Sequence, residues 1–216
     1  PTAKDKEGLE SKVAVNNNSQ VDMSSINMSL IKNEENANNQ TATSAYGLPP
    51  KKFPLSGVNI GDAIDLGSKN SEYFKNFKNQ KLIKKLEPYF GLRGEDAKTK
   101  LNTTPLKISS KEAAELNKFV QEKIFIELKT KWNKDSKIKF NELSTEQATV
   151  LYSVAYQYGT SFLLKNGKRM NFYIQALDNN WQGVKDELMD FKDKSDSINK
   201  RHIRAGKYLK QYLDKE

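Results

Sequence analysis

The spacing of apolar residues predicts helices through most of the chain after residue 78. Apolar side chains recur there every three or four positions, which is the period of one buried helix face. Ser109 and Glu112 form a capping box that predicts the start of a long helix. Ser144 and Gln147 form a second box, and Gly159 predicts the end of that helix. We expect helices over 79–89, 94–101, a long segment after 109, 144–158, and segments around 170–177, 181–191 and 205–212.

Residues 36–68 have a different pattern, which predicts strands. Asn, Thr, Ser, Gly and Pro dominate this stretch, and its apolar residues are spaced like short strands between turns. These apolar residues are Tyr46, Phe53, Val58, Ile60 and Ile64. We expect a small hairpin or three-stranded sheet here, as the only β-like stretch of the chain. Ahead of it, residues 25–35 predict a short helix that runs to Glu34 and Glu35.

Together these patterns predict an α+β fold that is mostly α. A small N-terminal β-lobe of about residues 36–68 precedes a larger multi-helix lobe of about residues 69–216. Residues 1–25 are polar and predict a linker or extension, of the kind that joins a further N-terminal module. We therefore expect one folded domain over residues 26–216, which suits a chain of 216 residues with an aromatic content of 10%.

The composition removes several kinds of chemistry. The chain has no Cys, which excludes disulfides, thiol catalysis and thiolate metal sites. Its single histidine, His202, argues against a His-rich metal centre or a hydrolase triad, and we expect it to be a partly exposed residue of the last helix. Catalysis would rest on carboxylates, hydroxyls, lysines or bound ions; we expect no cofactor and no metal ligands. Trp132 and Trp181 are expected in the core.

The charge balance indicates an anionic partner. Lys and Arg number 36 against 27 Asp and Glu, for a net charge of +9 and a pI near 9.4. Nucleic acid, acidic lipid and an anionic cell-wall polymer are all partners that fit this charge. A Lys-rich composition without any anionic partner also fits it. No apolar run approaches the roughly 18 residues that a membrane span needs, so we expect no membrane partner.

The densest group of chemically useful residues lies in the β-like stretch and at the end of the helix before it. Glu34 and Glu35 close that helix, and residues 56–67 read SGVNIGDAIDLG. The glycines let backbone approach a ligand, and Asp62 and Asp65 add carboxylates. A glutamate shielded at a helix end can act as a general acid, while an aspartate across a cleft holds a water. This is the two-carboxylate arrangement of inverting glycoside hydrolysis.

Taken alone, these residues also fit simpler interpretations. A Glu pair at the end of a helix is typical of solvated surface. The segment 56–67 is also typical of a turn, or of a calcium-binding loop, although it lacks the twelve-residue EF-hand pattern.

Four segments, in order along the chain, resemble a known family. Residues 56–67 resemble the SGVTIGxGxDLG segment of pesticin-type toxin domains, which are relatives of the lysozymes of T-even phages. Residues 86–97, LEPYFGLRGEDA, resemble the L-x-P-Y-x-G-L-x-G-x-x-A segment of that family. Residues 143–159 resemble the helix that carries ALxxxxxNxG in phage lysozymes, and 181–188 resemble the W-x-x-x-x-x-E-L that follows. The resemblance covers roughly residues 28–213.

The resemblance implies a lysozyme-like fold and hydrolysis of the β-1,4 bond between N-acetylmuramic acid and N-acetylglucosamine. It implies that Glu35 is the general acid, with Glu34 as the alternative. It further implies that Asn59 stands where the family holds the attacking water, and that Asp65 orients or activates this water, with inversion at the anomeric carbon. The residues expected to bind substrate are Ser56, Gly61, Asp62 and Tyr46.

Two positions depart from the family's motif. Asn59 replaces the usual Thr, and Ala63 replaces the second Gly. Asn still forms hydrogen bonds with water, whereas Ala63 narrows the freedom of the backbone. These departures keep open a second interpretation, a lysozyme-like module that binds peptidoglycan without cleaving it. A third, a nucleic-acid binder, rests on charge alone, and no helix-turn-helix, zinc or RNA-binding signature supports it; we expect no nucleic-acid partner.

The resemblance also implies a biological setting. Peptidoglycan glycan strands would be the substrate, and the chain would be the C-terminal domain of an antibacterial toxin, either a bacteriocin or a secretion-system effector. Such a domain is secreted or delivered, and it acts in the periplasm of target bacteria. We expect a monomer with an immunity protein as a further partner.

Overall fold

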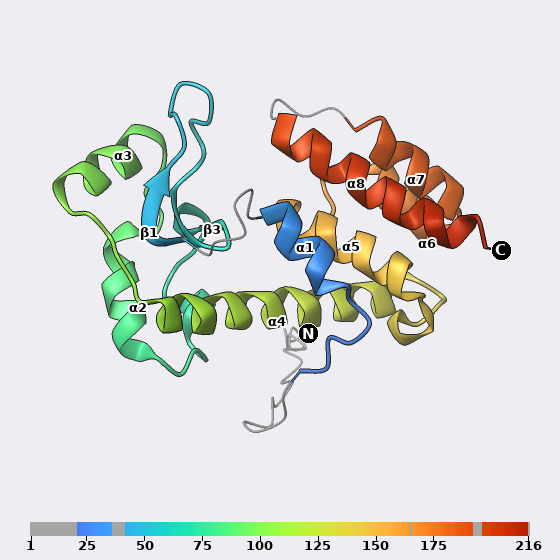
Figure 1. Ribbon diagram of the computed structural model, residues 1–216, viewed down its shortest axis with the longest axis horizontal. Helices are drawn as coiled ribbons and strands as arrows, with labels where there is room; N and C mark the ends of the chain where they lie inside the picture. The colour runs from blue at the N-terminus through green and yellow to red at the C-terminus, as the bar shows by residue number, and fades with distance from the viewer. Residues whose placement is uncertain (1–20, 36–41, 165, 192–195, 216) are drawn as a thin grey trace, which may run out of the picture.

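The computed structural model of the chain describes residues 21–35, 42–164, 166–191 and 196–215, and for residues 32–35 and 196–198 it describes the backbone alone. Figure 1 shows a small lobe, a larger helical lobe, and one long helix that runs through both. The expected α+β architecture, mostly helical with one small sheet, is confirmed.

The helices follow the predicted pattern closely. They are α1 (Met28–Glu35), α2 (Gln80–Leu86), α3 (Gly94–Thr103), α4 (Ser110–Asp135), α5 (Thr145–Tyr158), α6 (Asn171–Leu177), α7 (Trp181–Met189) and α8 (Asp196–Leu213). Both predicted capping boxes form, because Ser109 accepts from the Glu112 amide and Ser144 accepts from the Gln147 amide. Gly159 follows α5 with φ of 79°, a backbone conformation that glycine adopts without strain.

The sheet has three antiparallel strands in the order β1 (Ala42–Gly47), β2 (Val58–Gly61) and β3 (Ile64–Asp65). The core-facing residues of β2 and β3, Val58, Ile60 and Ile64, are almost wholly buried. Phe53, which was expected among the strands, lies instead in the connection between β1 and β2. The amides of Lys52 and Phe53 both donate to the Pro49 carbonyl, so this proline-rich stretch closes a turn.

Two separate cores divide the molecule. One is formed by buried residues from Val58 to Val120, and it joins the sheet, α2, α3 and the first half of α4. The other spans Ile26 to Leu209 and joins α1, the second half of α4 and α5 to α8. The core of the small lobe thus includes residues of α2 and α3 beside those of the sheet. The division at about residue 68 between a β-lobe and a multi-helix lobe stays a prediction, and so does the division between a linker of residues 1–25 and the folded domain.

The helix α5 is the centre of the helical lobe. Every residue from Gln147 to Ala155 is buried, so α5 is covered on all sides. Trp132 is fully buried beside it and donates from Nε1 to the Ile138 carbonyl, which confirms its place in the core. His202 is also fully buried, and its ring packs against the rings of Tyr158 and Phe191, so the expectation of partial exposure was wrong. The rings of Tyr158 and Phe191 also contact each other, so the three rings form one cluster.

A nearly buried carboxylate joins the end of α4 to α6. Asp135 Oδ2 accepts from Lys131 Nζ at 2.7 Å and from the Tyr173 hydroxyl at 3.2 Å, and Arg169 lies 3.6 Å away. Burial acts to raise the pKa of Asp135, but Lys131, Tyr173 and Arg169 outweigh it and hold the pKa below its usual value.

We predict that Asp135→Asn lowers the free energy of unfolding at pH 7 by about 1–3 kcal/mol, the scale of hydrogen bonds to a charged group. A carboxyl whose pKa is depressed by folding stabilises the protein above its unfolded pKa, and this contribution disappears as pH falls through the folded value. The difference between wild type and variant, measured by urea unfolding, should therefore shrink below about pH 4.

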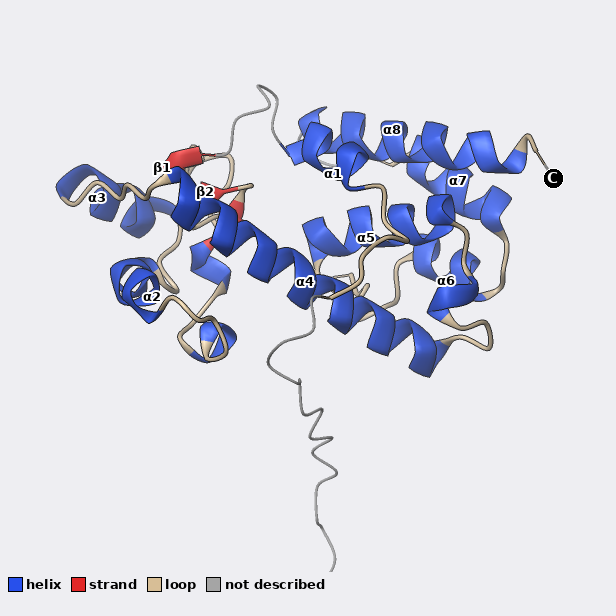
Figure 2. Cartoon of the chain, turned by 60° about the horizontal axis from the view of Figure 1, so that its bottom comes forward, coloured by secondary structure: helices blue, strands red, loops and turns tan. Residues whose placement is uncertain are grey.

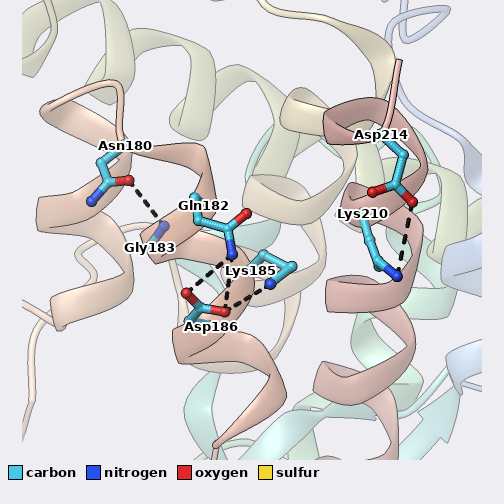
Figure 3. A network of polar contacts seen from close by, with 7 residues as sticks. All are labelled: Asn180, Gln182, Gly183, Lys185, Asp186, Lys210 and Asp214. Atoms are coloured by element: carbon cyan, nitrogen blue, oxygen red, sulfur yellow. Dashed lines mark hydrogen bonds and ion pairs between the residues drawn. The ribbon is translucent and has the colours of Figure 1, made fainter. Parts of the chain in front are cut away.

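Asp186→Asn provides the control for this comparison. Figure 3 shows Asp186 on α7 with its contacts to Lys185 and Gln182, beside the Lys210–Asp214 pair of α8. The Asp186 side chain is 61% exposed, and exposed pairs contribute little to stability. Equal losses in the two variants would contradict the account of Asp135.

Candidate active site

The register of the sheet aligns three of the predicted site residues in one row. Tyr46 of β1 pairs with Asn59 of β2, and Asn59 pairs with Asp65 of β3. Side chains of directly paired residues lie on the same face of a sheet, and here it is the face opposite the core residues of the small lobe. Tyr46 is 40% exposed, Asp65 is half-buried and Asn59 is 6% exposed. The sheet thus presents an aromatic ring, an amide and a carboxylate side by side.

The Asp65 carboxylate is fixed by backbone donors. Its Oδ1 accepts from the Gly67 amide at 2.8 Å and from the Gly57 amide at 3.1 Å. Both bonds use the same oxygen, so the orientation of the carboxylate is set while Oδ2 takes no part in them. This arrangement suits a carboxylate that has to hold a small ligand at a defined place.

Gly57 and Gly67 are required because two chain segments cross at this carboxylate. A Cβ on Gly57 would lie 2.4 Å from the Gly67 Cα and 2.5 Å from Asp65 Oδ1, and a Cβ on Gly67 would lie 2.5 Å from the Leu92 carbonyl oxygen. No side chain fits between backbone atoms at these distances. Gly57 and Gly67 of the 56–67 segment therefore serve the carboxylate.

The segment 91–94 stabilises the two crossing segments with three hydrogen bonds. The Gly91 amide donates to the Leu66 carbonyl, Arg93 Nε donates to the Gly67 carbonyl at 3.2 Å, and the Gly94 amide donates to the Ser56 carbonyl at 2.9 Å. Sequence reasoning named this segment only through its resemblance, and it missed the role of Arg93.

The Asn59 amide is oriented by the turn before β2. Its Nδ2 donates to the Gly57 carbonyl at 3.0 Å and to Ser56 Oγ at 3.3 Å. With the amide nitrogen directed to this turn, the oxygen Oδ1 is the acceptor that Asn59 offers on the other side. Ser56 thus acts on the amide of Asn59 in this structure.

The β2–β3 turn places Asp62 against the helices. Its amide donates to Asn117 Oδ1 at 2.8 Å, and Gln121 Nε2 donates to its Oδ2 at 3.4 Å. Asp62 is 4% exposed. Gly61 has φ of 63°, and a Cβ there would lie 2.4 Å from Asn117 Oδ1, so glycine allows the turn to reach α4. Ala63 also has a positive φ, of 56°.

Lys69 is a charged group near Asp65 that sequence reasoning missed. Its Nζ lies 4.3 Å from the centre of the Tyr73 ring, and Lys123 Nζ of α4 lies 4.5 Å from the same ring. Burial lowers the pKa of Lys69, while the negative charges of Asp65 and Glu127 act to raise it. Its place two residues after the DLG of the motif is the only signal in the sequence.

The glutamates of α1 come from the other lobe. Glu34 and Glu35 are the last two residues of α1, as expected, and their side chains lie outside the described residues. Ile26 and Ile31 belong to the core of the helical lobe, and the Asn27 amide donates to Thr149 Oγ1 of α5. Figures 1 and 2 show α1 ending on the side that faces the sheet. Any chemistry that joins Glu35 to Asp65 therefore depends on how the two lobes are placed.

Two further features of the described residues concern binding. A hollow of about 460 Å³ lies where residues 21–24 pass α4 at Lys118, Gln121 and Glu122, and Tyr46, Asn59 and Asp65 are not among its lining residues. Within the same part of the chain, no group of three or more His, Cys, Asp or Glu residues is placed to hold a metal ion.

Comparison with known proteins decides the family. Residues 25–182 match the pesticin family, described as the C-terminal part of a bacterial toxin homologue of phage lysozyme. This chain belongs to the pesticin family. Of the four segments that resemble the family, three lie wholly within this match. The match ends within α7, at residue 182. The resemblance that we expect beyond residue 182, to about residue 213, therefore stays a prediction.

Two further comparisons concern solved structures and curated proteins. A solved structure described as the active form of the P1 phage endolysin Lyz is similar, with 15% sequence identity over 92% of this chain and 89% of that chain and a TM-score of 0.49. No curated protein matches.

We predict that Gly57→Ala destabilises this pesticin-family domain. Its Cβ would have to displace the backbone of Gly67, so the free energy of unfolding should fall by about 2 kcal/mol or more, as in overpacked cores. Urea unfolding monitored by circular dichroism measures the change.

Gly47→Ala is the matched control in β1, because its Cβ would lie 3.7 Å from Leu101 Cδ1, an ordinary contact. If the two variants are equally stable, the crossing at Asp65 is not as tight as described.

Proposed function

We propose that the chain is a muramidase, a glycoside hydrolase that cleaves the β-1,4 bond between N-acetylmuramic acid and N-acetylglucosamine in peptidoglycan. Membership of a family of lysozyme-related toxin domains supports the substrate class. The observation that carries the chemistry is the row of Tyr46, Asn59 and Asp65, in which a carboxylate is fixed by two backbone amides beside an oriented side-chain amide.

In this mechanism Glu35 at the end of α1 protonates the oxygen of the leaving sugar, with Glu34 as the alternative acid. Hydrolysis needs an acid on one side of the scissile bond and an activated water on the other. The two lobes supply these separately, since α1 belongs to the helical lobe and Asp65 to the small lobe.

Asp65 then takes the proton from the attacking water. Its Oδ1 is occupied by the amides of Gly57 and Gly67, so Oδ2 is the oxygen that receives the water's proton. Asn59 Oδ1 accepts the second hydrogen of that water, because Nδ2 is already bound to the turn. Attack from the face opposite to the leaving group inverts the anomeric carbon.

Substrate contacts follow from exposure. The exposed Tyr46 ring offers a flat surface for a sugar, next to Asn59 across the sheet. We assign Ser56, Gly61 and Asp62 to the binding site because they fix the turns that flank the row. Ser56 belongs to the turn before β2, and Gly61 and Asp62 belong to the β2–β3 turn.

The setting that we propose is the C-terminal domain of an antibacterial toxin, a bacteriocin or secretion-system effector, that reaches the periplasm of target bacteria. The domain would act there as a monomer and bind an immunity protein in the producing cell. A net charge of +9 favours approach to an anionic wall. Among the described helices, none is both long and apolar enough to cross a membrane.

The test is digestion of purified peptidoglycan with mass analysis of the released fragments. Wild type should release disaccharide-peptides with a reducing muramic acid end, and Asp65→Asn and Glu35→Gln should each lower the rate by at least about 10²-fold, the scale of general acid–base catalysis. Glu95→Gln, on the exposed face of α3, is the control and should keep the wild-type rate.

Each alternative outcome has a defined meaning. Loss of activity in Glu34→Gln with retention in Glu35→Gln would move the acid by one residue. If the wild-type protein pellets with the wall and releases no fragments, the enzyme assignment is overturned. That result would support the binding-only interpretation, which the departures from the family motif at Asn59 and Ala63 favour.

A second prediction concerns the departure at Asn59. Asn59→Thr should retain cleavage, because a hydroxyl also accepts a hydrogen bond from water, whereas Asn59→Val, of similar shape without the hydroxyl, should lower the rate by about tenfold or more. Initial rates on the same peptidoglycan, with circular dichroism to verify folding, measure the effect. Equal rates for Thr and Val would remove Asn59 from the water site.

A further inference from the structure

The β2–β3 turn is attached to the helices at three atoms of one residue. Asn117 accepts from the Asp62 amide, Gln121 donates to its carboxylate, and the Tyr156 hydroxyl donates to its carbonyl at 2.9 Å. Asp62 is 4% exposed, so these bonds form largely away from bulk water. Since the peptide groups on either side of the Asp62 Cα are both held by hydrogen bonds, the turn has little freedom.

Tyr156 differs from the other two partners because it belongs to the helical lobe. Asn117 and Gln121 lie in the first half of α4, close to the sheet, whereas Tyr156 is on α5 and packs against the other core. Its hydrogen bond to Asp62 therefore joins the lobes directly. The continuous helix α4 also connects the lobes, Ile124 of α4 packs against both cores, and the Tyr152 hydroxyl of α5 donates to the Gln121 carbonyl of α4.

We propose that Tyr156 is a positioning residue, whose hydroxyl holds the β2–β3 turn at a fixed place relative to the helical lobe. This inference rests on the proposed muramidase function. Asn59 and Asp65 lie three residues on either side of Asp62, so any shift of the turn moves both. The acid at the end of α1 belongs to the lobe that carries Tyr156. The hydroxyl thus sets the placement of the water-binding pair against the acid.

Catalysis is sensitive to this placement. An inverting glycosidase needs its two carboxyl groups roughly 6.5–9.5 Å apart so that a water fits between sugar and base. A misplacement of about 1 Å can cost about 10²-fold in rate. Loss of the Tyr156 hydroxyl should therefore lower kcat more than it raises KM, because the residues that contact the sugar remain.

The experiment compares Tyr156→Phe with Tyr89→Phe on soluble peptidoglycan fragments. Tyr89 is also buried, and its hydroxyl donates to the Thr104 carbonyl at 2.8 Å, a bond that lies within the small lobe. We expect Tyr156→Phe to lower kcat by about tenfold or more with KM changed by less than about threefold. Tyr89→Phe should keep kcat within about twofold of wild type. Rates are divided by the folded fraction from thermal unfolding.

A distance measurement reports the placement of the lobes without activity. Since the chain has no Cys, spin labels can be attached at Thr99→Cys on α3 and Lys207→Cys on α8, both exposed, in otherwise wild-type and Tyr156→Phe protein. We expect the distribution of distances between labels to shift or broaden in Tyr156→Phe and to stay unchanged in Tyr89→Phe, since the Tyr89 hydroxyl bonds within the small lobe.

The outcomes separate this inference from the proposed function. If wild type releases no fragments, the muramidase assignment is wrong and the positioning role falls with it. If wild type is active and Tyr156→Phe keeps its kcat per folded molecule and its distance distribution, the positioning role alone is overturned. A kcat loss that matches the unfolded fraction likewise reduces Tyr156 to a structural residue.

Discussion

The double hydrogen bond from Gly57 and Gly67 to the Asp65 carboxylate is the interaction around which the small lobe is arranged. It requires two segments to cross with backbone atoms almost in contact, which only glycine allows at these positions. The 91–94 segment covers the crossing with three further hydrogen bonds, and the sheet register then brings Tyr46 and Asn59 alongside the carboxylate. A single oriented carboxylate thus accounts for Gly57 and Gly67 and for much of the local backbone.

The second constraint is the division of the protein into two cores connected by α4. A helix of 26 residues has one half in each core, so it fixes the distance between lobes but leaves their relative orientation to side contacts. The hydrogen bond from Tyr156 to Asp62 is such a contact, and the packing of α1 on α5 fixes the glutamates within the helical lobe. The proposed reaction divides its acid and its base between these two lobes.

Much of the fold could be predicted because local signals agree with the final structure. Both capping boxes, the end of α5 at Gly159 and the place of α1 before Glu35 were recognised from short-range patterns that need no tertiary information. The predictions for Phe53 and His202 were wrong because they depended on contacts that local patterns do not show. Phe53 lies in the turn that closes at the Pro49 carbonyl and not in a strand. His202 is packed against the rings of Tyr158 and Phe191, which come from other segments of the chain.

The candidate site was predictable in its residue types and not in its support. Asn59, Asp65 and Tyr46 were named from a motif and from spacing, and the register places them together. Lys69, Arg93, Asn117, Gln121 and Tyr156 were missed as site residues, because their roles arise from contacts between segments up to 94 residues apart. A single sequence contains no periodic signal for such contacts.

The most direct test of the central claim, a two-carboxylate hydrolysis with water held at Asp65, is the configuration of the first product. Proton NMR of a peptidoglycan fragment during digestion, recorded before mutarotation, distinguishes the two anomers of the new reducing end. Attack by a water from the face opposite to the leaving group predicts that the α-anomer appears first. Initial release of the β-anomer would indicate a covalent intermediate and would contradict the role given to Asp65 and Asn59.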